Sequence, residues 1–250
     1  MRKACLFMIS ARNHLLKECL TYVDSNYNKK YNYPILIFYH NHLSDTYGNE
    51  YYREDIRRIN SKTDIRFHPI EAKIPDHLQE KDMFWNLPNA YAANFGRQRL
   101  GYLHANHFWN NFMNYSELDE FDYMMRIDDD SWFKKEIPFD FFEELDNRNG
   151  YFGTGFTWNH FSSGHMDTRY GLFKWIKNYV EKYNITVKDE QLRESLNGEV
   201  DNIKFHTLKW NCGNSNVYNR KMFETEEWKR YLNESNSSGG GYRYRWVDCE

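Results

Sequence analysis

Three consecutive aspartates, Asp128, Asp129 and Asp130, directly follow an apolar run in this 250-residue chain. If that run is a strand that continues through them, Asp128 and Asp130 point to one side and Asp129 points away. Carboxylate oxygens so placed could hold a hard divalent cation such as Mg²⁺ or Mn²⁺ and leave coordination positions for phosphate oxygens. Such a cation would stabilise a departing diphosphate as a Lewis acid. A solvated acidic turn is the alternative, but adjacent carboxylates repel one another, a cost that a bound cation would remove.

The residues before the triplet must form the strand that positions it, and residues 121–127 have the composition of one. Residues 4–9 and 34–39 are two further apolar runs of the kind that buried parallel strands produce. Apolar side chains recur at helical spacing from Leu15 to Val23 and predict a helix between these two strands. Other expected elements are a strand at 65–69, a helix over 97–113, a helix over 139–145, a strand over 151–156 and a helix over 172–180.

Alternating strands and helices predict an α/β fold with a mainly parallel sheet flanked by helices on both faces. Ligands bind such sheets at the carboxyl ends of the strands, where the aspartates lie. We expect loop with helical turns over 71–94, an exposed polar stretch over 184–204, and a flexible loop at Ser235–Gly241. The length suits one domain or two tightly joined halves, and one domain is the default.

The bulk composition excludes some classes of ligand. The formal net charge is −3 and the pI is about 6.4, so nothing marks the whole surface as a binder of nucleic acid or anionic lipid. The aromatic content is 18%, with 20 Tyr and 8 Trp. Such rings pack in cores or lie against sugars and bases in a cleft.

Features near the N-terminus bear on the compartment. The apolar run there is too short for a membrane helix and has no cleavage site of a signal peptide, so we expect no membrane segment and a soluble, cytoplasmic protein unless an anchor has been removed. Asn-X-Ser/Thr triplets argue weakly for secretion, and they lie at Asn114, Asn184, Asn233 and Asn236. The four cysteines lack metal-binding spacing, so we expect mostly free thiols.

The acidic segment resembles a known family. Residues 122–133, Asp-Tyr-Met-Met-Arg-Ile-Asp-Asp-Asp-Ser-Trp-Phe, look like the Tyr-Trp-Arg-Val-Glu-Pro-Asp-Val segment of the fungal Golgi α-1,2-mannosyltransferases, the yeast glycolipid 2-α-mannosyltransferase family. Further blocks similar to that family's sequence are residues 10–13, 27–34, 223–231 and 239–248. These blocks are collinear and span nearly the whole chain, which makes them more specific together than any one alone.

The resemblance implies a GT-A-type, Rossmann-like fold, a GDP-mannose donor, a glycan or glycoprotein acceptor, Mn²⁺ (or Mg²⁺), and transfer of a hexose with retention of configuration. It implies one domain over residues 1–250, with a nucleotide-binding part at about 1–135 and an acceptor-binding part at about 136–250. Asp128 stands at the family's Glu and Asp130 at its Asp, as metal ligands, with Asp128 also at the donor. A Golgi-lumenal location would follow if an anchor precedes the domain.

The resemblance also assigns donor-binding residues. Arg12 falls on the family's arginine in the first strand-to-helix turn, where a cation near a helix N-terminus suits phosphate. Asn13 beside it and Arg126 before the acidic triplet are the other donor-binding candidates. A surface salt bridge is the alternative interpretation of Arg12.

Two departures from the family pattern matter. The family's candidate nucleophile, a Glu, falls on Asn216 when we count back without gaps from Phe223. An amide cannot form a glycosyl ester, so Asn216 positions substrate while attack proceeds on the leaving-group face, or another carboxylate substitutes, or the outcome has changed. The family's metal-ligating His lies beyond the position of Glu250, so we expect truncation and an incomplete ligand set.

The close of the chain holds the candidate acceptor residues. Asp248 is a candidate base or acceptor ligand, with a helix cap as the alternative. Tyr244 and Trp246, with Tyr242, form a sugar-stacking platform or a strand with one buried aromatic face. His104 and His107 could suggest a metal pair, but they lack an adjacent carboxylate, and we interpret them as helix packing or polar contacts.

Two other functions compete with a glycosyltransferase. A binding module of the same fold that has lost turnover is favoured by Asn216 and opposed by the intact acidic triplet. A Mg²⁺-dependent phosphotransferase or nuclease would also use clustered aspartates, but the sequence has no Walker loop and no second acidic cluster.

Overall fold

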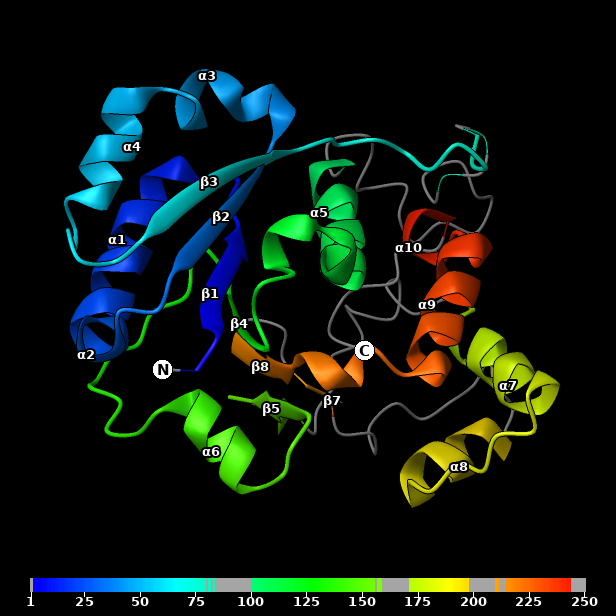
Figure 1. Cartoon of the computed structure of the whole chain (residues 1–250). Helices are drawn as coiled ribbons and strands as arrows, with labels where there is room; N and C mark the ends of the chain where they lie inside the picture. The colour runs from blue at the N-terminus through cyan, green and yellow to red at the C-terminus, as the bar shows by residue number, and fades with distance from the viewer. Residues whose placement is uncertain are drawn as a thin grey trace. The chain divides into compact units, whose positions relative to one another are not determined.

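The computed structural model describes residues 2–79, 81, 83, 100–155, 157–158, 171–197, 210–211 and 215–243 (Figure 1). The chain divides into two compact units that interleave along the sequence. The first comprises Met1–Ala72, Asn111–Phe156 and Cys212–Lys229, and the second comprises Lys73–Asn110, Thr157–Asn211 and Arg230–Glu250. Each unit is therefore assembled from three separate stretches of chain.

A six-stranded sheet organises the first unit, in the order β3-β2-β1-β4-β8-β5. Its strands are β1 (Ala4–Ile9), β2 (Ile35–His40), β3 (Ile65–Ile70), β4 (Tyr123–Ile127), β5 (Phe152–Thr154) and β8 (Ser215–Asn219). Strands β3, β2, β1 and β4 pair in parallel, while β8 pairs antiparallel with both β4 and β5. The expected mainly parallel sheet is confirmed, and β8 is the one reversed strand among them.

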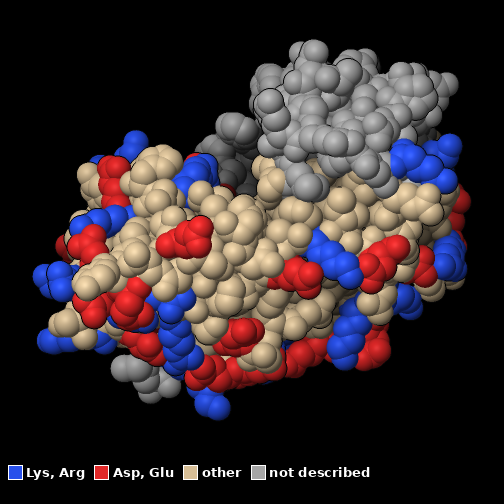
Figure 2. Space-filling view, turned by 90° about the horizontal axis from the view of Figure 1, so that it is seen from above, with Lys and Arg blue, Asp and Glu red and all other residues tan. Residues whose placement is uncertain are grey.

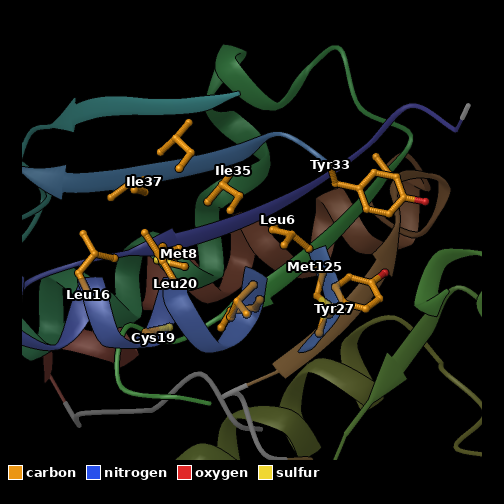
Figure 3. Close-up of a cluster of buried hydrophobic side chains, with 14 of the residues drawn as sticks. Leu6, Met8, Leu16, Cys19, Leu20, Tyr27, Tyr33, Ile35, Ile37 and Met125 are labelled. Carbon is orange, nitrogen blue, oxygen red and sulfur yellow. The ribbon is translucent and has the colours of Figure 1, made fainter. Parts of the chain in front are cut away.

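Strands β1 and β2 are buried on both faces, which explains their largely apolar sequences. Every residue of β1 and β2 is buried. On one face, α1 (Asn13–Val23) packs through residues spaced at i, i+3, i+4 and i+7, beginning at Leu16 (Figure 3). Figure 3 labels part of this core: Leu6, Met8, Leu16, Cys19, Leu20, Tyr27, Tyr33, Ile35, Ile37 and Met125.

Further helices of the first unit are α2 (Lys29–Tyr31), α3 (Ser44–Tyr47), α4 (Glu50–Arg57) and α6 (Phe141–Asn147). Side chains cap the N-termini of α4 and α6. Asn49 accepts hydrogen bonds from backbone N–H groups at the start of α4, and Asp140 accepts one at the start of α6. Ile56 and Phe142 join these helices to the core on the α1 face. On the opposite face, the 3₁₀ turn Phe112–Asn114 packs on the sheet, with the ring of Phe112 4.9 Å from that of Phe7.

The second unit is mainly helical where it is described. It contains α5 (Leu100–Asn111, whose last residue belongs to the first unit), α7 (Leu172–Lys182), α8 (Glu190–Asn197), α10 (Gly240–Arg243) and the two-stranded pair β6 (Thr157–Trp158) and β7 (Trp210–Asn211). Helix α9 (Glu226–Ser238) begins in the first unit and continues into the second. Phe173 of α7 and Leu196 of α8 form a small buried cluster.

One expectation for the C-terminal half is confirmed in its described part, and another was wrong. Residues 184–197 of the stretch 184–204, expected to be exposed and polar, are mostly exposed, and α8 forms within them because Leu192 and Leu196 recur at helical spacing and pack against α7. The segment Ser235–Gly241, expected to be a flexible loop, is the end of α9 followed by α10. Gly239 adopts φ +68° between these helices, the left-handed conformation that commonly ends a helix at glycine.

Charged side chains of both signs lie on the face shown in Figure 2. This agrees with the near-neutral net charge of −3. None of the helices in the described ranges has the length and apolar character that crossing a bilayer requires. Cys5 and Cys19 are buried free thiols, as expected, and the other two cysteines lie outside the described residues.

Candidate functional site

The acidic triplet lies at the carboxyl end of β4, which ends at Ile127. Ser131 N–H donates to the carbonyl of Asp128 at 3.0 Å, so the chain turns at the triplet instead of continuing as a strand. The three carboxylates nonetheless divide as expected: Asp129 is 2% exposed, whereas Asp128 and Asp130 are 21% and 35% exposed. Asp128 and Asp130 are thus accessible to a ligand, and Asp129 is not.

The carboxylate of Asp129 binds the turn between β1 and α1. Its Oδ2 atom accepts three hydrogen bonds: from Ser10 Oγ at 3.0 Å, from Ala11 N at 3.0 Å and from Arg12 N at 2.9 Å. Its Oδ1 atom accepts from Arg12 Nε at 2.8 Å and also contacts Arg12 Nη2. A carboxylate at a helix N-terminus is electrostatically favourable, so Asp129 stabilises the start of α1.

Arg12 bridges two of the three aspartates. Its Nη1 contacts Asp130 Oδ2 while the other edge of the guanidinium contacts Asp129. Partial burial lowers the pKa of Arg12, but the hydrogen bond to Asp129 and the charges of both aspartates outweigh this and raise the pKa above its ordinary value. The salt-bridge interpretation of Arg12 therefore describes this structure. The Arg12 side chain is 45% exposed, and a donor contact would use its exposed part.

Arg126 serves Asp128 in a similar way. The Arg126 side chain is only 5% exposed, and its Nε donates to Asp128 Oδ1 at 3.0 Å. Two arginines thus offset the repulsion among the three carboxylates, the cost that a bound cation was expected to remove. The five side chains retain a formal charge of −1, which still favours a cation.

The sheet brings Asn216 beside this cluster. In the antiparallel pairing of β4 and β8, Asn216 lies opposite Arg126. Asn216 is buried, and its Nδ2 donates to the hydroxyl of Tyr218 at 3.3 Å. The candidate at the nucleophile position is thus adjacent to the acidic turn although about ninety residues separate them in sequence.

The remaining predicted residues fall into two groups. Asn13 is exposed at the first position of α1, and its carbonyl accepts from Tyr52 Oη at 3.2 Å. Tyr244, Trp246 and Asp248 lie outside the described residues.

The histidine pair and Tyr242 belong to the second unit. His104 Nδ1 lies 2.9 Å from the hydroxyl of Tyr242, and the ring of His107 also contacts that tyrosine. The expected packing and polar contacts of this pair are confirmed. Tyr242 is buried in α10, so a strand is wrong for this residue.

The sequence analysis missed two residues that support Asp129, because they belong to no distinctive motif. Ser10 and Tyr47 are both almost fully buried, and their hydroxyl oxygens lie 2.8 Å apart. Burial raises the pKa of Tyr47 to about 12, and the hydrogen bond to Ser10 opposes that shift. The only available signal was a polar residue, Ser10, at the end of a fully apolar strand and before a helix.

The chemistry of the exposed acids suits a hard cation. Carboxylate oxygens are the ligands that Mn²⁺ and Mg²⁺ accept. Asp130 engages Arg12 through Oδ2 only, which leaves its Oδ1 without a protein partner in the described ranges. Within those ranges, no three Asp, Glu, His or Cys side chains cluster as a metal site. Asp128 and Asp130 could thus supply two of the ligands of such an ion.

Comparison with solved structures supports the fold. Core-mannan synthase A (CmsA/Ktr4) from Aspergillus fumigatus, solved in an Mn/GDP form, superposes with a TM-score of 0.80 and 17% identity, over 100% of this chain and 68% of its own. The mannosyltransferase Ktr4p from S. cerevisiae has a TM-score of 0.79 and 17% identity, both in complex with GDP (99% of this chain, 64% of its own) and in a second structure (99% and 63%). This chain therefore spans about two-thirds of the length of these proteins, and the predicted GT-A-type fold is confirmed.

Comparison of sequences supports the family. No curated protein sequence matches the chain significantly. The family profile described as glycolipid 2-alpha-mannosyltransferase matches residues 1–250, which is the whole chain. The collinear blocks, the sheet with its acidic turn and this full-length match agree, and the chain belongs to the glycolipid 2-alpha-mannosyltransferase family.

Proposed function

We propose that this chain transfers mannose from GDP-mannose to a hydroxyl group of a glycan or glycoprotein, with Mn²⁺ as the cofactor and retention of anomeric configuration. The observation that carries the proposal is the pair of accessible carboxylates, Asp128 and Asp130, beside Arg12 at the carboxyl ends of β4 and β1. Anionic ligands of open α/β sheets bind at that edge. Family membership supports a mannosyl donor, and the Mn and GDP in structural neighbours support the cation and nucleotide.

The charged residues divide the work at the donor. Asp128 and Asp130 hold the ion, which when bound supplies Lewis-acid stabilisation of the diphosphate. Arg12 contributes the exposed part of its guanidinium to phosphate oxygens, because planar N–H donors match that geometry. Asn13 lies next to it on α1, and Arg126 fixes the Asp128 carboxylate through Nε.

Asn216 positions the sugar rather than attacking it. Its amide lies buried opposite Arg126, and an amide cannot form the glycosyl ester of a double-displacement reaction. In the alternative that retains configuration, the acceptor oxygen bonds to the anomeric carbon on the face that the diphosphate leaves. The acceptor proton passes to the departing phosphate oxygen or to Asp248, and the products are GDP and the mannosylated acceptor.

The acceptor side rests on the resemblance. We assign Tyr244 and Trp246 to acceptor binding and Asp248 to acceptor binding or proton transfer. The family profile covers the whole chain, which supports a single catalytic domain containing both units. The family and the four glycosylation triplets support a Golgi-lumenal location.

A transfer assay with GDP-mannose, a mannoside acceptor and Mn²⁺ tests this function. We expect a mannosylated product that disappears with EDTA and returns with added Mn²⁺, and no product from UDP-sugars. The binding-module alternative, favoured by Asn216, predicts GDP-mannose affinity without product or donor hydrolysis. Isothermal titration of the same protein sample separates the two outcomes, because it reports binding whether or not turnover occurs.

A further inference from the structure

We propose that Asp129 is a positioning residue that orients the guanidinium of Arg12 toward the donor diphosphate. This inference rests on the proposed function and adds a residue to it. Asp129 is not among the residues that the resemblance assigns to the metal or to the donor.

The two oxygens of Asp129 perform separate tasks. Among the described contacts, Oδ2 accepts from the turn itself: from the Ser10 hydroxyl and from the backbone N–H groups of Ala11 and Arg12. Within the part of the chain that the structure describes, Oδ1 accepts from the Arg12 side chain, through Nε at 2.8 Å and through Nη2. One oxygen therefore holds the backbone and the other fixes the direction of the guanidinium.

The Asp129 carboxylate already occupies the N-terminus of α1. The N–H groups of Ala11 and Arg12, which would otherwise be available to an anion, donate to Oδ2. A donor phosphate that reaches this turn would therefore meet the outer part of the Arg12 guanidinium instead of these two N–H groups. Three of the five N–H donors of Arg12 are engaged by Asp129 and Asp130 in the described structure, and two remain for phosphate oxygens.

The carboxylate of Asp129 is itself held in place by buried side chains. Ser10 Oγ, which donates to Asp129, also lies 2.8 Å from the hydroxyl of Tyr47. The Tyr47 ring stacks on Tyr39 with centroids 5.1 Å apart, and Arg53 donates to the Tyr47 carbonyl. Because Ser10, Tyr47 and Asp129 are almost fully buried, the oxygen that directs Arg12 has a fixed position.

If the Arg12 side chain moved freely, donor binding would have to order it, and the loss of rotamer entropy would weaken the affinity for the donor. With Nε held by Asp129, most of that ordering precedes the ligand. Asp130 receives Nη1 of the same guanidinium, so the phosphate anchor and a metal-ligand candidate are kept adjacent.

The variant Asp129→Asn tests the contact with the Arg12 guanidinium separately from the contacts with the turn. Its remaining carbonyl oxygen can accept from the turn, while its amide N–H₂ faces the N–H groups of Arg12 in place of Oδ1. Asp140→Asn is the matched control: Asp140 is also a buried carboxylate of the first unit that accepts from a backbone N–H and from side-chain hydroxyls. It contacts neither Arg12 nor the acidic turn among the described contacts.

The experiment is a double-mutant cycle on GDP affinity, measured by isothermal titration in the presence of Mn²⁺. We expect Asp129→Asn to weaken GDP binding about tenfold in the native background, as for loss of a charge-assisted contact, and less than about twofold in an Arg12→Ala background. Asp140→Asn should leave GDP affinity unchanged. An NMR spectrum of the arginine Nε–H groups should show a protected Arg12 signal that Asp129→Asn removes.

Equal weakening by Asp129→Asn in both backgrounds, or no weakening in either, overturns the positioning role while the proposed function stands. Absence of GDP binding by the native chain overturns both. If Asp129→Asn does not fold, Arg12→Lys decides the question, because lysine keeps the charge but lacks the Nε–H that Asp129 holds. A loss like that of Arg12→Ala supports the role, and native affinity in Arg12→Lys contradicts it.

Discussion

Arg12 Nε donates to Asp129 Oδ1 at 2.8 Å and thereby joins two residues 117 positions apart in the sequence. The contact connects the turn after β1 to the turn after β4, two adjacent parallel strands of one sheet. Both turns therefore lie at the same carboxyl edge. The Arg12 guanidinium, which we expect to bind a donor phosphate, is thus already ordered by the protein. It contacts Asp130, which we expect to hold a metal ion.

Asp130→Asn should abolish transfer and leave the fold intact. The amide retains the shape of the side chain but loses the charge that holds a divalent ion, so we expect kcat/KM to fall by at least about a hundredfold. Circular dichroism and thermal melting serve as controls for folding. Full activity of this variant would show that the acidic turn is not the metal site.

Asn216→Ala should lower kcat modestly, by less than about tenfold, since a positioning amide contributes only hydrogen bonds. The residue lies in β8 beside Arg126, where alanine fits the strand. Single-turnover rates with saturating donor measure this effect free of changes in KM. Near-complete loss of the chemical step would instead place Asn216 at the centre of the reaction.

Asp140→Ala should lower the free energy of unfolding by about 3 kcal/mol, because two buried tyrosine hydroxyls and the first turn of α6 lose their acceptor. The contacts are Tyr33 Oη at 2.6 Å, Tyr27 Oη at 3.2 Å and Phe142 N at 3.0 Å. Asp140→Asn keeps an acceptor and should cost only about 1 kcal/mol. Urea denaturation of both variants provides the comparison, and equal stability of Asp140→Ala and the native chain would contradict it.

His68 should make stability depend on pH on the acidic side of neutrality. Burial lowers the pKa of His68, and although Glu117 raises it, Arg66 adds to the lowering. Because the folded pKa lies below the unfolded value of about 6.5, the unfolded chain binds the proton first. The contribution of neutral His68 to the free energy of unfolding is therefore complete above pH about 6.5 and is lost as the pH falls through the folded pKa.

His68→Gln should therefore flatten the stability curve in that window. Urea unfolding at a series of pH values, for the native chain and the variant, measures the difference. An identical acid slope in both proteins would show that His68 contributes nothing to the dependence on pH.

Much of the fold could be predicted because several elements have clear local signals. The runs at β1 and β2 are almost entirely apolar, as expected of strands that are buried on both faces. The reversed strand β8 gave no such signal, since Ser215–Asn219 contains three polar residues. Helix α8 was missed because its apolar face consists of few residues, and its packing against Phe173 is not visible in sequence.

The site was predictable in type and only partly in geometry. The acidic triplet and Arg12 were identified from sequence, but their ion pairs depend on a turn at Asp128 that ends the strand. The place of Asn216 beside Arg126 depends on the antiparallel register of β8. Contacts of this kind, between residues far apart in the chain, are set by the assembled sheet and have no local pattern.

A crystal structure of the chain soaked with Mn²⁺ and GDP tests the central claim most directly. We expect one manganese ion with carboxylate oxygens of Asp128 and Asp130 at about 2.0–2.3 Å and diphosphate oxygens completing its coordination, while Arg12 contacts a phosphate. Anomalous scattering at the manganese edge identifies the ion. Density for manganese and GDP away from the acidic turn, with both carboxylates facing solvent, would contradict the claim.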